Sequence, residues 1–324
     1  MDQFGKHFIL SDYGGTHDGW IGGVISGCPK GIRIDFDAIK MEMERRAPSS
    51  HFLSTQRQET DQVEFLSGIH EGITTGDPIE FRIQNTDVKP NNSLENILKP
   101  SHASYTYKMK YGIENNRGIG RASARQTACR VVAGAIAKQI LSQYGISIET
   151  YIDSQTLTQL KDIENIVDFN DTIGAKVHGV IRNLPAGLGE PVYDKFHARL
   201  GYAMLSINAA KGFEIGKGFQ AAQMVGSEYN DTQNEDFSFN SNNDGGVQAG
   251  ITNGQEVNFS VAFKPIPTIQ KEQKSVNFQG ESVTFLGNKR NDICVVPRVL
   301  PVIEAMAAMV VLDFILISQI DPIQ

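Results

Sequence analysis

The segment that decides the fold is SARQTACRVVAGAIAKQILSQY, residues 123–144. It opens with Ser-x-x-Gln, a capping-box pattern that predicts a helix N-terminus at Ser123, and it stops at Gly145, a residue type that commonly ends helices. Between these ends, apolar side chains occur on nearly every side of the helix instead of forming one stripe. A helix of this kind is usually buried all round. We therefore predict a core helix that lies between sheet layers.

Further helices and strands are predicted on both sides of this helix in the sequence. Residues 35–46 begin with Asp35 as an N-cap candidate and end before Pro48, and residues 301–317 place Pro301 at the first helical position. Runs of β-branched and aromatic residues predict strands at 20–25, 63–66, 79–83, 177–181, 257–263 and 283–286. Strands and helices do not alternate strictly, so we predict an α+β fold. The polar, weakly patterned stretch 149–171 is expected to be a surface excursion.

Composition narrows the class of protein. The chain has 324 residues, 40% of them hydrophobic, a net charge of −7 and a pI near 5.5, which argues against nucleic-acid binding. Cys28, Cys129 and Cys294 lack metal-site spacing, so we expect buried, reduced thiols and no metal site. Glu304 and Asp313 interrupt the apolar segment 302–317, which favours a core helix over a membrane span. Because the N-terminus lacks the apolar core of a signal peptide, we expect a soluble, cytoplasmic protein.

Several positively charged residues are candidates for anion binding. Residues 120–123, Gly-Arg-Ala-Ser, lead into the capped helix, whose free N–H groups and positive dipole end suit a phosphate, and Arg121 and Arg125 add charge. An ordinary helix cap with solvated arginines explains the same short pattern. Arg45 and Arg46 could simply complement a helix C-terminus, and Lys264 could be a strand-end cation.

Two of the seven histidines lie in distinctive loops. His17 sits in a glycine-flanked loop, residues 14–19, where backbone can approach a ligand closely, and His102 lies in the sequence PSHASY, residues 100–105. A lone loop histidine is more often structural than catalytic. The residues by themselves therefore do not decide whether His17 and His102 are catalytic or structural.

Taken together, about a dozen short segments resemble the chorismate synthase family in order and spacing, from about residue 4 to residue 317. They are STQR (54–57), LSGIHEG (66–72), TTGDP (74–78), NTD (85–87), ASYTY (103–107), KYG (110–112), GRASAR (120–125), PAGLGEP (185–191), SINAAKG (206–212), GG (245–246), KPIPT (264–268) and PVIEAM (301–306).

The resemblance implies a lyase of the shikimate pathway, which serves aromatic amino acid biosynthesis. Its reaction is the 1,4-anti elimination of phosphate from 5-enolpyruvylshikimate 3-phosphate to give chorismate, with reduced FMN and no net redox change. It implies one domain over residues 1–324, with helices sandwiched between antiparallel sheet layers and a shortened excursion near 149–171. Family members are usually cytoplasmic homotetramers. NADPH is expected only indirectly, through an external flavin reductase, and no nucleic-acid or membrane partner is expected.

The resemblance also assigns roles to residues. His17 matches the proton donor to the departing phosphate, His102 the histidine beside the reduced flavin, and Asp292 an acid near the flavin N5 with Thr16 as its relay. Arg45, Arg46 and Arg125 match positions that neutralise the substrate's anionic groups. The FMN positions are Arg121, Ala122, Ser123, Asn208, Ala209, Ala249, Lys264, Pro265, Ile266, Pro267, Thr268 and Arg290.

The chain departs from the family pattern near these ligands. The usual Gly-Glu-Ser-His-Gly loop reads Gly-Gly-Thr-His-Asp at residues 14–18, and the usual Gly-Arg-His-Asp-Pro-Cys reads Lys-Arg-Asn-Asp-Ile-Cys at residues 289–294. Asp18 could raise the pKa of His17 or repel the substrate phosphate. Two alternatives follow from these departures: a non-catalytic flavin-binding paralogue, and an enzyme for a related phosphorylated enol ether. Other departures are Phe52 for an arginine, Ala122 for a serine and Ala249 for a glycine.

Overall fold

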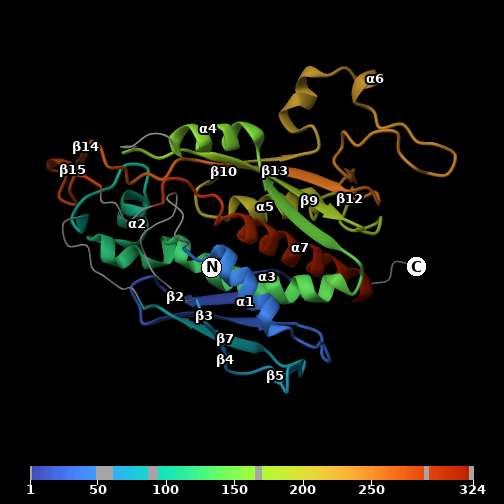
Figure 1. Cartoon of the computed structure of the whole chain (residues 1–324), viewed down its shortest axis with the longest axis horizontal. Coiled ribbons are helices and arrows are strands. Elements are labelled where there is room, and N and C mark those ends of the chain that lie inside the picture. Colours follow the sequence, from blue (N-terminus) through green and yellow to red (C-terminus); the bar gives the residue numbers. More distant parts are fainter. Residues whose placement is uncertain (1, 49–60, 87–93, 165–169, 288–291, 321–324) are drawn as a thin grey trace.

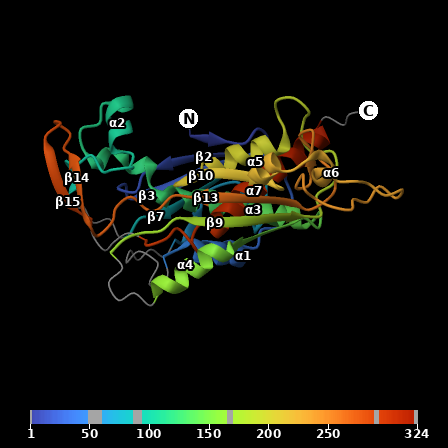
Figure 2. The ribbon, with the colours of Figure 1, turned by 90° about the horizontal axis from the view of Figure 1, so that it is seen from above.

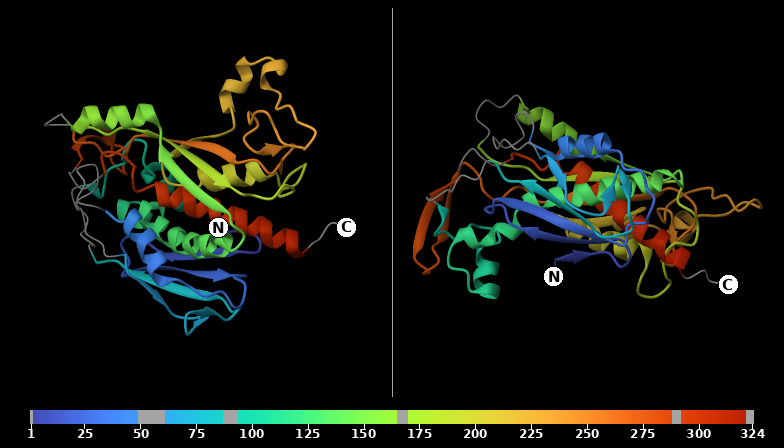
Figure 3. Two further views of the ribbon diagram at one scale, coloured as in Figure 1. Left: turned by 45° about the vertical axis from the view of Figure 1, so that its right-hand side comes forward. Right: turned by 90° about the horizontal axis from the view of Figure 1, so that it is seen from below.

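The structure is a computed structural model that describes residues 2–48, 61–86, 94–164, 170–287 and 292–320. Two antiparallel sheets enclose a layer of helices (Figure 1, Figure 3). The first sheet has the order β1-β2-β3-β7-β4 and the second the order β10-β13-β9-β8. This arrangement confirms the predicted α+β class with helices between antiparallel layers.

Nine strands form the two main sheets of the described structure, and six more form small hairpins. The first sheet contains β1 (Gln3–Phe4), β2 (Ile9–Gly14), β3 (Trp20–Ser26), β4 (Val63–Phe65) and β7 (Ile79–Gln84). The second contains β8 (Ser147–Ile152), β9 (Ala175–Arg182), β10 (Ala210–Ile215) and β13 (Val257–Phe263). Small hairpins are formed by β5 (Ile69–His70) with β6 (Ile73–Thr74), β11 (Val247–Gln248) with β12 (Ile251–Thr252), and β14 (Glu272–Val276) with β15 (Ser282–Leu286).

The helix layer is a row of four helices, α5 (Phe196–Leu205), α7 (Leu300–Ile320), α3 (Thr127–Ser142) and α1 (Phe36–Arg46), as the view from above shows (Figure 2). Its centre is the crossing of α3 and α7. A Cβ atom placed on Gly134 would lie 2.2 Å from the Cβ of Ala305, so the two backbones meet where only glycine fits. Around the row lie α2 (Ser104–Tyr111), α4 (Ser154–Glu164), α6 (Gly226–Tyr229) and the 3-10 turns η2 (Asn116–Ala122), η3 (Ala124–Gln126) and η4 (Gly218–Gln223).

The apolar C-terminal helix α7 lies in the core. By length and composition it could cross a membrane, yet 83% of its apolar window is buried inside the protein. Its two carboxylates are paired there. Asp313 accepts hydrogen bonds from the backbone N–H groups of Lys6, His7 and Phe8 and pairs with Arg199 at 2.9 Å. The prediction of a core helix is therefore confirmed.

Most predicted elements are present, including all six strands and Asp35 as the N-cap of α1. The predicted capping box is wrong. Ser123 caps a short 3-10 turn, accepting from Arg125 N at 3.2 Å, and α3 begins only at Thr127. The side-chain oxygen of Gln126, which would have to accept to close the box, instead accepts from Arg121 Nη1 at 3.2 Å. The three cysteines are buried and free, as expected.

The stretch 149–171 was expected to be a surface excursion, and its described part contains regular structure that was not predicted. Residues 147–152 form the edge strand β8, and residues 154–164 form α4. Asp153 accepts from Gln155 N at 2.9 Å and so caps the helix. The sequence looks weakly patterned because an edge strand and an outer helix each bury only a narrow side. Residues 165–169 lie outside the described residues.

Candidate active site

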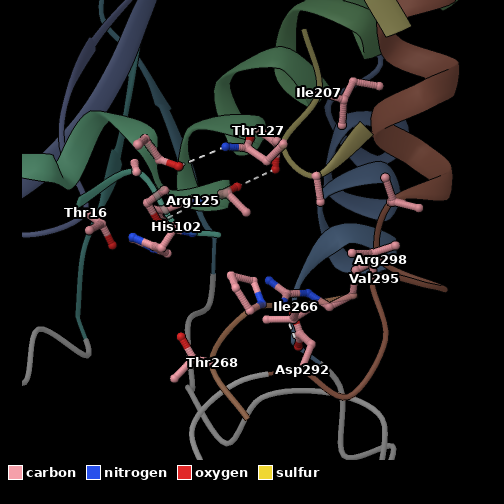
Figure 4. Close-up of a pocket in the computed structure, with 18 of the residues that line it drawn as sticks. Thr16, His102, Arg125, Thr127, Ile207, Ile266, Thr268, Asp292, Val295 and Arg298 are labelled. Carbon is pink, nitrogen blue, oxygen red and sulfur yellow. Dashed lines mark hydrogen bonds and ion pairs between the residues drawn. The ribbon is translucent and has the colours of Figure 1, made fainter. Parts of the chain in front are cut away.

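A cavity of about 560 Å³ lies where the N-terminal ends of η3 and α7 meet loops from both sheets (Figure 4). Sequence-distant segments supply its walls: the turn after β2, the end of α1, the loop before α2, the loop before α7 and the segment after β13. The described lining residues that carry charge or an imidazole ring are His17, Arg46, Lys99, His102, Arg125, Lys264, Asp292 and Arg298.

Arg46 and Arg125 are the most buried charged residues of the described lining, with side chains that are each 3% exposed. Both pair with Asp61, which lies beneath them and is fully buried. Arg46 Nη2 lies 2.5 Å from Asp61 Oδ2, and Arg125 Nη1 donates to Asp61 Oδ1. Burial alone would raise the pKa of Asp61, but Arg46 and Arg125 outweigh it, so that the pKa is lowered and the carboxylate stays ionised.

Asp292 and Arg298 form a second ion pair on the opposite wall (Figure 4). Arg298 Nη1 donates to both carboxylate oxygens of Asp292, at 2.8 and 2.7 Å. Its Nε donates to the backbone oxygen of Arg46 at 3.0 Å. Arg298 therefore fixes the position of Asp292 relative to the end of α1, and it joins the two walls of the cavity.

His102 is a largely buried base among cations. Burial, with the nearby charges of Lys99 and Lys264, lowers its pKa to about 4, so its ring is neutral at pH 7. Its Nδ1 lies 3.4 Å from the hydroxyl oxygen of Ser104, which donates to Asn116 at 2.7 Å. Burial also lowers the pKa of Lys99. An anionic ligand in this cavity would raise both pKa values by favouring the charged forms.

The turn that carries Thr16 and His17 is held from below by Asn85. The side-chain amide of Asn85 donates to Gly15 O at 3.1 Å and to Asp18 O at 2.7 Å. The carboxylate of Asp18 accepts from Gly15 N at 2.7 Å and does not line the cavity. The local role of Asp18 is therefore to close its own turn, which weakens the expectation that it repels a bound phosphate.

Charge in the cavity opposes the charge of the whole protein. Of the described residues that line it, five are Lys or Arg and one is a carboxylate, whereas the chain as a whole carries −7. Asp61, below the surface of the cavity, compensates one more of these positive charges. The site therefore attracts anions locally although the protein is acidic.

The structure brings most of the predicted site residues together. Those lining the cavity are Thr16, His17, Arg46, His102, Ala122, Ser123, Arg125, Asn208, Ala209, Lys264, Ile266, Pro267, Thr268 and Asp292. Segments up to 276 residues apart in the chain, from Thr16 to Asp292, thus meet at one place.

Some predicted residues lie elsewhere. Arg45 points away from the cavity and pairs with Glu304 at 2.8 Å, because it sits about 100° around α1 from Arg46. Arg121 pairs with Asp2 and Asp12, each at 2.7 Å, outside the lining. Pro265 and Ala249 are not lining residues either, and Ala249 instead accepts from Lys195 at 3.4 Å. Arg290, Phe52 and Asn291 lie outside the described residues.

The geometry agrees with comparisons to known proteins. A model of the family described as chorismate synthase matches residues 8–316. The chain belongs to the chorismate synthase family. Relatives named chorismate synthase include one from Christiangramia forsetii, 46% identical over 97% of both chains, and one from Bacteroides thetaiotaomicron, 45% identical over 98% of this chain and 99% of that protein. A solved structure titled "Crystal Structure of Chorismate Synthase" superposes with a TM-score of 0.76 at 28% identity, covering 97% of this chain and 93% of that one.

Chorismate synthase family motifs do not reveal every residue of the site. Lys99, Arg298 and Asp61 were not singled out from the sequence, although two of them line the cavity and the third holds its arginines. For Lys99, the only signal was its position three residues before His102. For Arg298, it was a cation just before the Pro301 helix start. Asp61 has no local signal, because its partners are distant in sequence.

Proposed function

We propose that this protein catalyses the 1,4-anti elimination of phosphate from 5-enolpyruvylshikimate 3-phosphate to give chorismate, with reduced FMN bound in the same cavity. The observation that carries this proposal is a single cavity, rich in cations, that contains both family histidines, Arg46, Arg125 and most of the expected FMN positions. Family membership supplies the reaction class, and the lining supplies groups suited to an anionic substrate.

The described residues fit a flavin phosphate and an anionic substrate. Lys99 and Lys264 line the cavity, and neither has a carboxylate partner within the described part of the chain; Lys264 donates instead to Ser101 O. The volume of about 560 Å³ lies in the range of small-molecule sites. We propose that Ser123, Asn208, Ala209 and the segment 264–268 hold FMN. When bound, reduced FMN would supply transient electron density to the substrate.

The chain's own groups then have separate tasks. Arg46 and Arg125 present guanidinium groups that can bind the substrate's phosphate and carboxylates, and they need little reorganisation because Asp61 already holds them. His17, which lines the same cavity, is the proposed proton donor to the departing phosphate, which leaves poorly as a bare dianion. His102, neutral at pH 7, can donate an N–H group to an anion in the cavity. Asp292, with its position fixed by Arg298, is the proposed proton acceptor, and Thr16 is its proposed relay.

We also propose, from family membership, a cytoplasmic homotetramer that relies on an external reductant for its flavin. These properties do not affect the choice of experiment, provided that reduced flavin is supplied directly.

The deciding measurement is an anaerobic assay with dithionite-reduced FMN and 5-enolpyruvylshikimate 3-phosphate, in which chorismate absorbance and phosphate release are followed together. We expect equal amounts of both products, and at least 100-fold less of each with His17→Ala. FMN binding without either product would refute the proposal and favour the non-catalytic paralogue. If the protein makes no chorismate but releases phosphate from a related phosphorylated enol ether, the result would favour an enzyme for that other substrate.

A further inference from the structure

A buried carboxylate below the cavity joins two of its cations. Asp61 does not line the cavity, and its side chain is 0% exposed. One of its oxygens pairs with Arg46 and the other with Arg125. Its backbone φ is +49°, a left-handed conformation that is unusual for a residue other than glycine. The chain therefore takes an unfavourable local conformation at the point where one carboxylate reaches two arginines.

Arg46 has hydrogen-bonding capacity that the described residues do not use. Its side chain is 3% exposed, and its Nε atom lacks a hydrogen-bond partner within the described part of the chain. Buried N–H groups are normally paired, since leaving one unpaired costs about 1–3 kcal/mol. The Nε of Arg199 is unmatched as well, but of the two arginines Arg46 is the one that lines the cavity, where an anion can approach its guanidinium.

The same network reaches the turn of His17. Arg125 Nε donates to Asn85 Oδ1 at 2.8 Å, and the amide of Asn85 donates to the backbone oxygens of Gly15 and Asp18. Asn85 is 7% exposed, so it uses both ends of its amide inside the protein. One continuous path of hydrogen bonds thus runs from Arg46 through Asp61, Arg125 and Asn85 to the turn that bears the proposed proton donor.

We propose that Asp61 and Asn85 are positioning residues: Asp61 holds Arg46 and Arg125 as one anion-binding pair, and Asn85 sets that pair relative to His17. This inference rests on the proposed function, because it assigns the pair to the substrate's anionic groups. Neither residue touches the cavity's contents. Each acts through a group that does.

Electrostatics gives Asp61 a measurable signature. Burial lowers the pKa of Arg46 to about 10; Asp61 opposes this shift, whereas Arg298 and Arg125 add to it. Without the Asp61 carboxylate, the buried guanidinium of Arg46 would lose the charge that offsets its burial, while the opposing charges of Arg298 and Arg125 remain. The pKa of Arg46 would fall further, so its charge would be lost at a lower pH than in the native protein.

The first test compares Asp61→Asn with Asp313→Asn, which alters another buried carboxylate paired with an arginine but remote from the cavity. Binding of inorganic phosphate is measured by calorimetry at pH 7 and pH 9, with FMN present to fill its own phosphate site. We expect phosphate affinity at pH 9 to be at least tenfold weaker in Asp61→Asn than in the native protein, while Asp313→Asn follows the native protein. Native-like affinity of Asp61→Asn at both pH values would overturn the proposal.

A second pair of variants avoids unpaired buried charge. Asn85→Ala cuts the link to the His17 turn, and Asn277→Ala removes a comparably buried asparagine, 8% exposed, from the β14–β15 turn. We expect kcat of Asn85→Ala to fall at least tenfold with KM changed less than threefold, and Asn277→Ala to retain native kinetics. Native kcat in Asn85→Ala would contradict the role of Asn85. If the native protein makes no chorismate, the proposed function fails, and the phosphate titration still decides the role of Asp61.

Discussion

Arg45 and Arg46 are adjacent residues at the end of one helix, yet they belong to different regions of the molecule. Arg45 faces the α3–α7 crossing, where Glu304 accepts from Arg45, Lys138 and Thr150, each at 2.8 Å. Arg46 faces the cavity and pairs with Asp61. In the first region one carboxylate satisfies several donors, and in the second one carboxylate is shared by two arginines.

The difference lies in what is left unsatisfied. Lys138 and Arg45 are 25% and 42% exposed, so water can complete their hydrogen bonding. Glu42 pairs with both of them as well, so two carboxylates meet two cations in the Glu304 cluster. Arg46 and Arg125 are each 3% exposed and share the Asp61 carboxylate, and Arg46 keeps one buried N–H group that no described residue accepts. A cluster whose charges are matched serves stability, whereas one that lines a cavity with a buried donor left over is suited to binding an anion.

The largest expected effect breaks the Glu304 cluster. Glu304→Gln leaves Arg45 and Lys138 with Glu42 as their remaining carboxylate partner. It removes a buried charge that accepts from Arg45, Lys138 and Thr150, which should lower the free energy of unfolding by about 3 kcal/mol. Urea denaturation at pH 7 measures this loss. Because Glu304 does not line the cavity, the folded variant should keep its kcat/KM within threefold. A tenfold fall in kcat/KM would show that the two clusters are not separate in function.

A somewhat smaller effect breaks the cluster of Arg46, Arg125 and Asp61. Arg46→Ala removes one half of the anion-binding pair, and kcat/KM should fall at least 100-fold, equivalent to about 2.7 kcal/mol of transition-state stabilisation. The matched variant is Arg45→Ala, whose kcat/KM should fall less than threefold. Steady-state kinetics under reducing, anaerobic conditions measures both. Equal losses in the two variants would end the distinction between the neighbouring arginines.

The smallest effect concerns His102, which lies in the cavity near Lys99 and Lys264. Among the described residues, His102 has no carboxylate partner. Its folded pKa of about 4 lies below the ordinary value of 6.5, so the unfolded chain binds the proton more tightly. Stability from this group is therefore present at neutral pH and is lost as pH falls from about 6.5 towards 4. We expect a loss of about 2 kcal/mol between pH 7 and pH 5, which His102→Gln should abolish. Urea denaturation at both pH values, native against variant, measures this difference.

The sequence predicted the regular elements well, because burial leaves a periodic trace. The strand 257–263 alternates between buried and less buried positions, and α3 is apolar on nearly all sides in both sequence and structure. It did not predict the edge strand and the outer helix at residues 147–164, which bury too little to leave a clear period.

Prediction of the site depended on the family resemblance more than on local chemistry. The motifs placed His17, His102 and Asp292 in one site, and all three line the cavity. They could not separate Arg45 from Arg46, since that depends on which partner each meets across the layer. Asp61 could not be found either, because its importance comes from two arginines that lie 15 and 64 positions away in the chain.

The contact between Gly134 and Ala305 has a consequence for the cavity's tolerance of change. Gly134 lies seven residues from the start of α3, about 10 Å along the helix, and Ala305 lies five residues into α7. The N-terminal ends of both helices lie at the cavity, so the distance between the helices at their crossing also sets the distance between those ends. A single methyl group added at Gly134 would push the two helices apart and move Arg125 away from Arg298, although neither arginine had been altered. The protein's sensitivity to mutation therefore extends well beyond the residues that can touch a ligand.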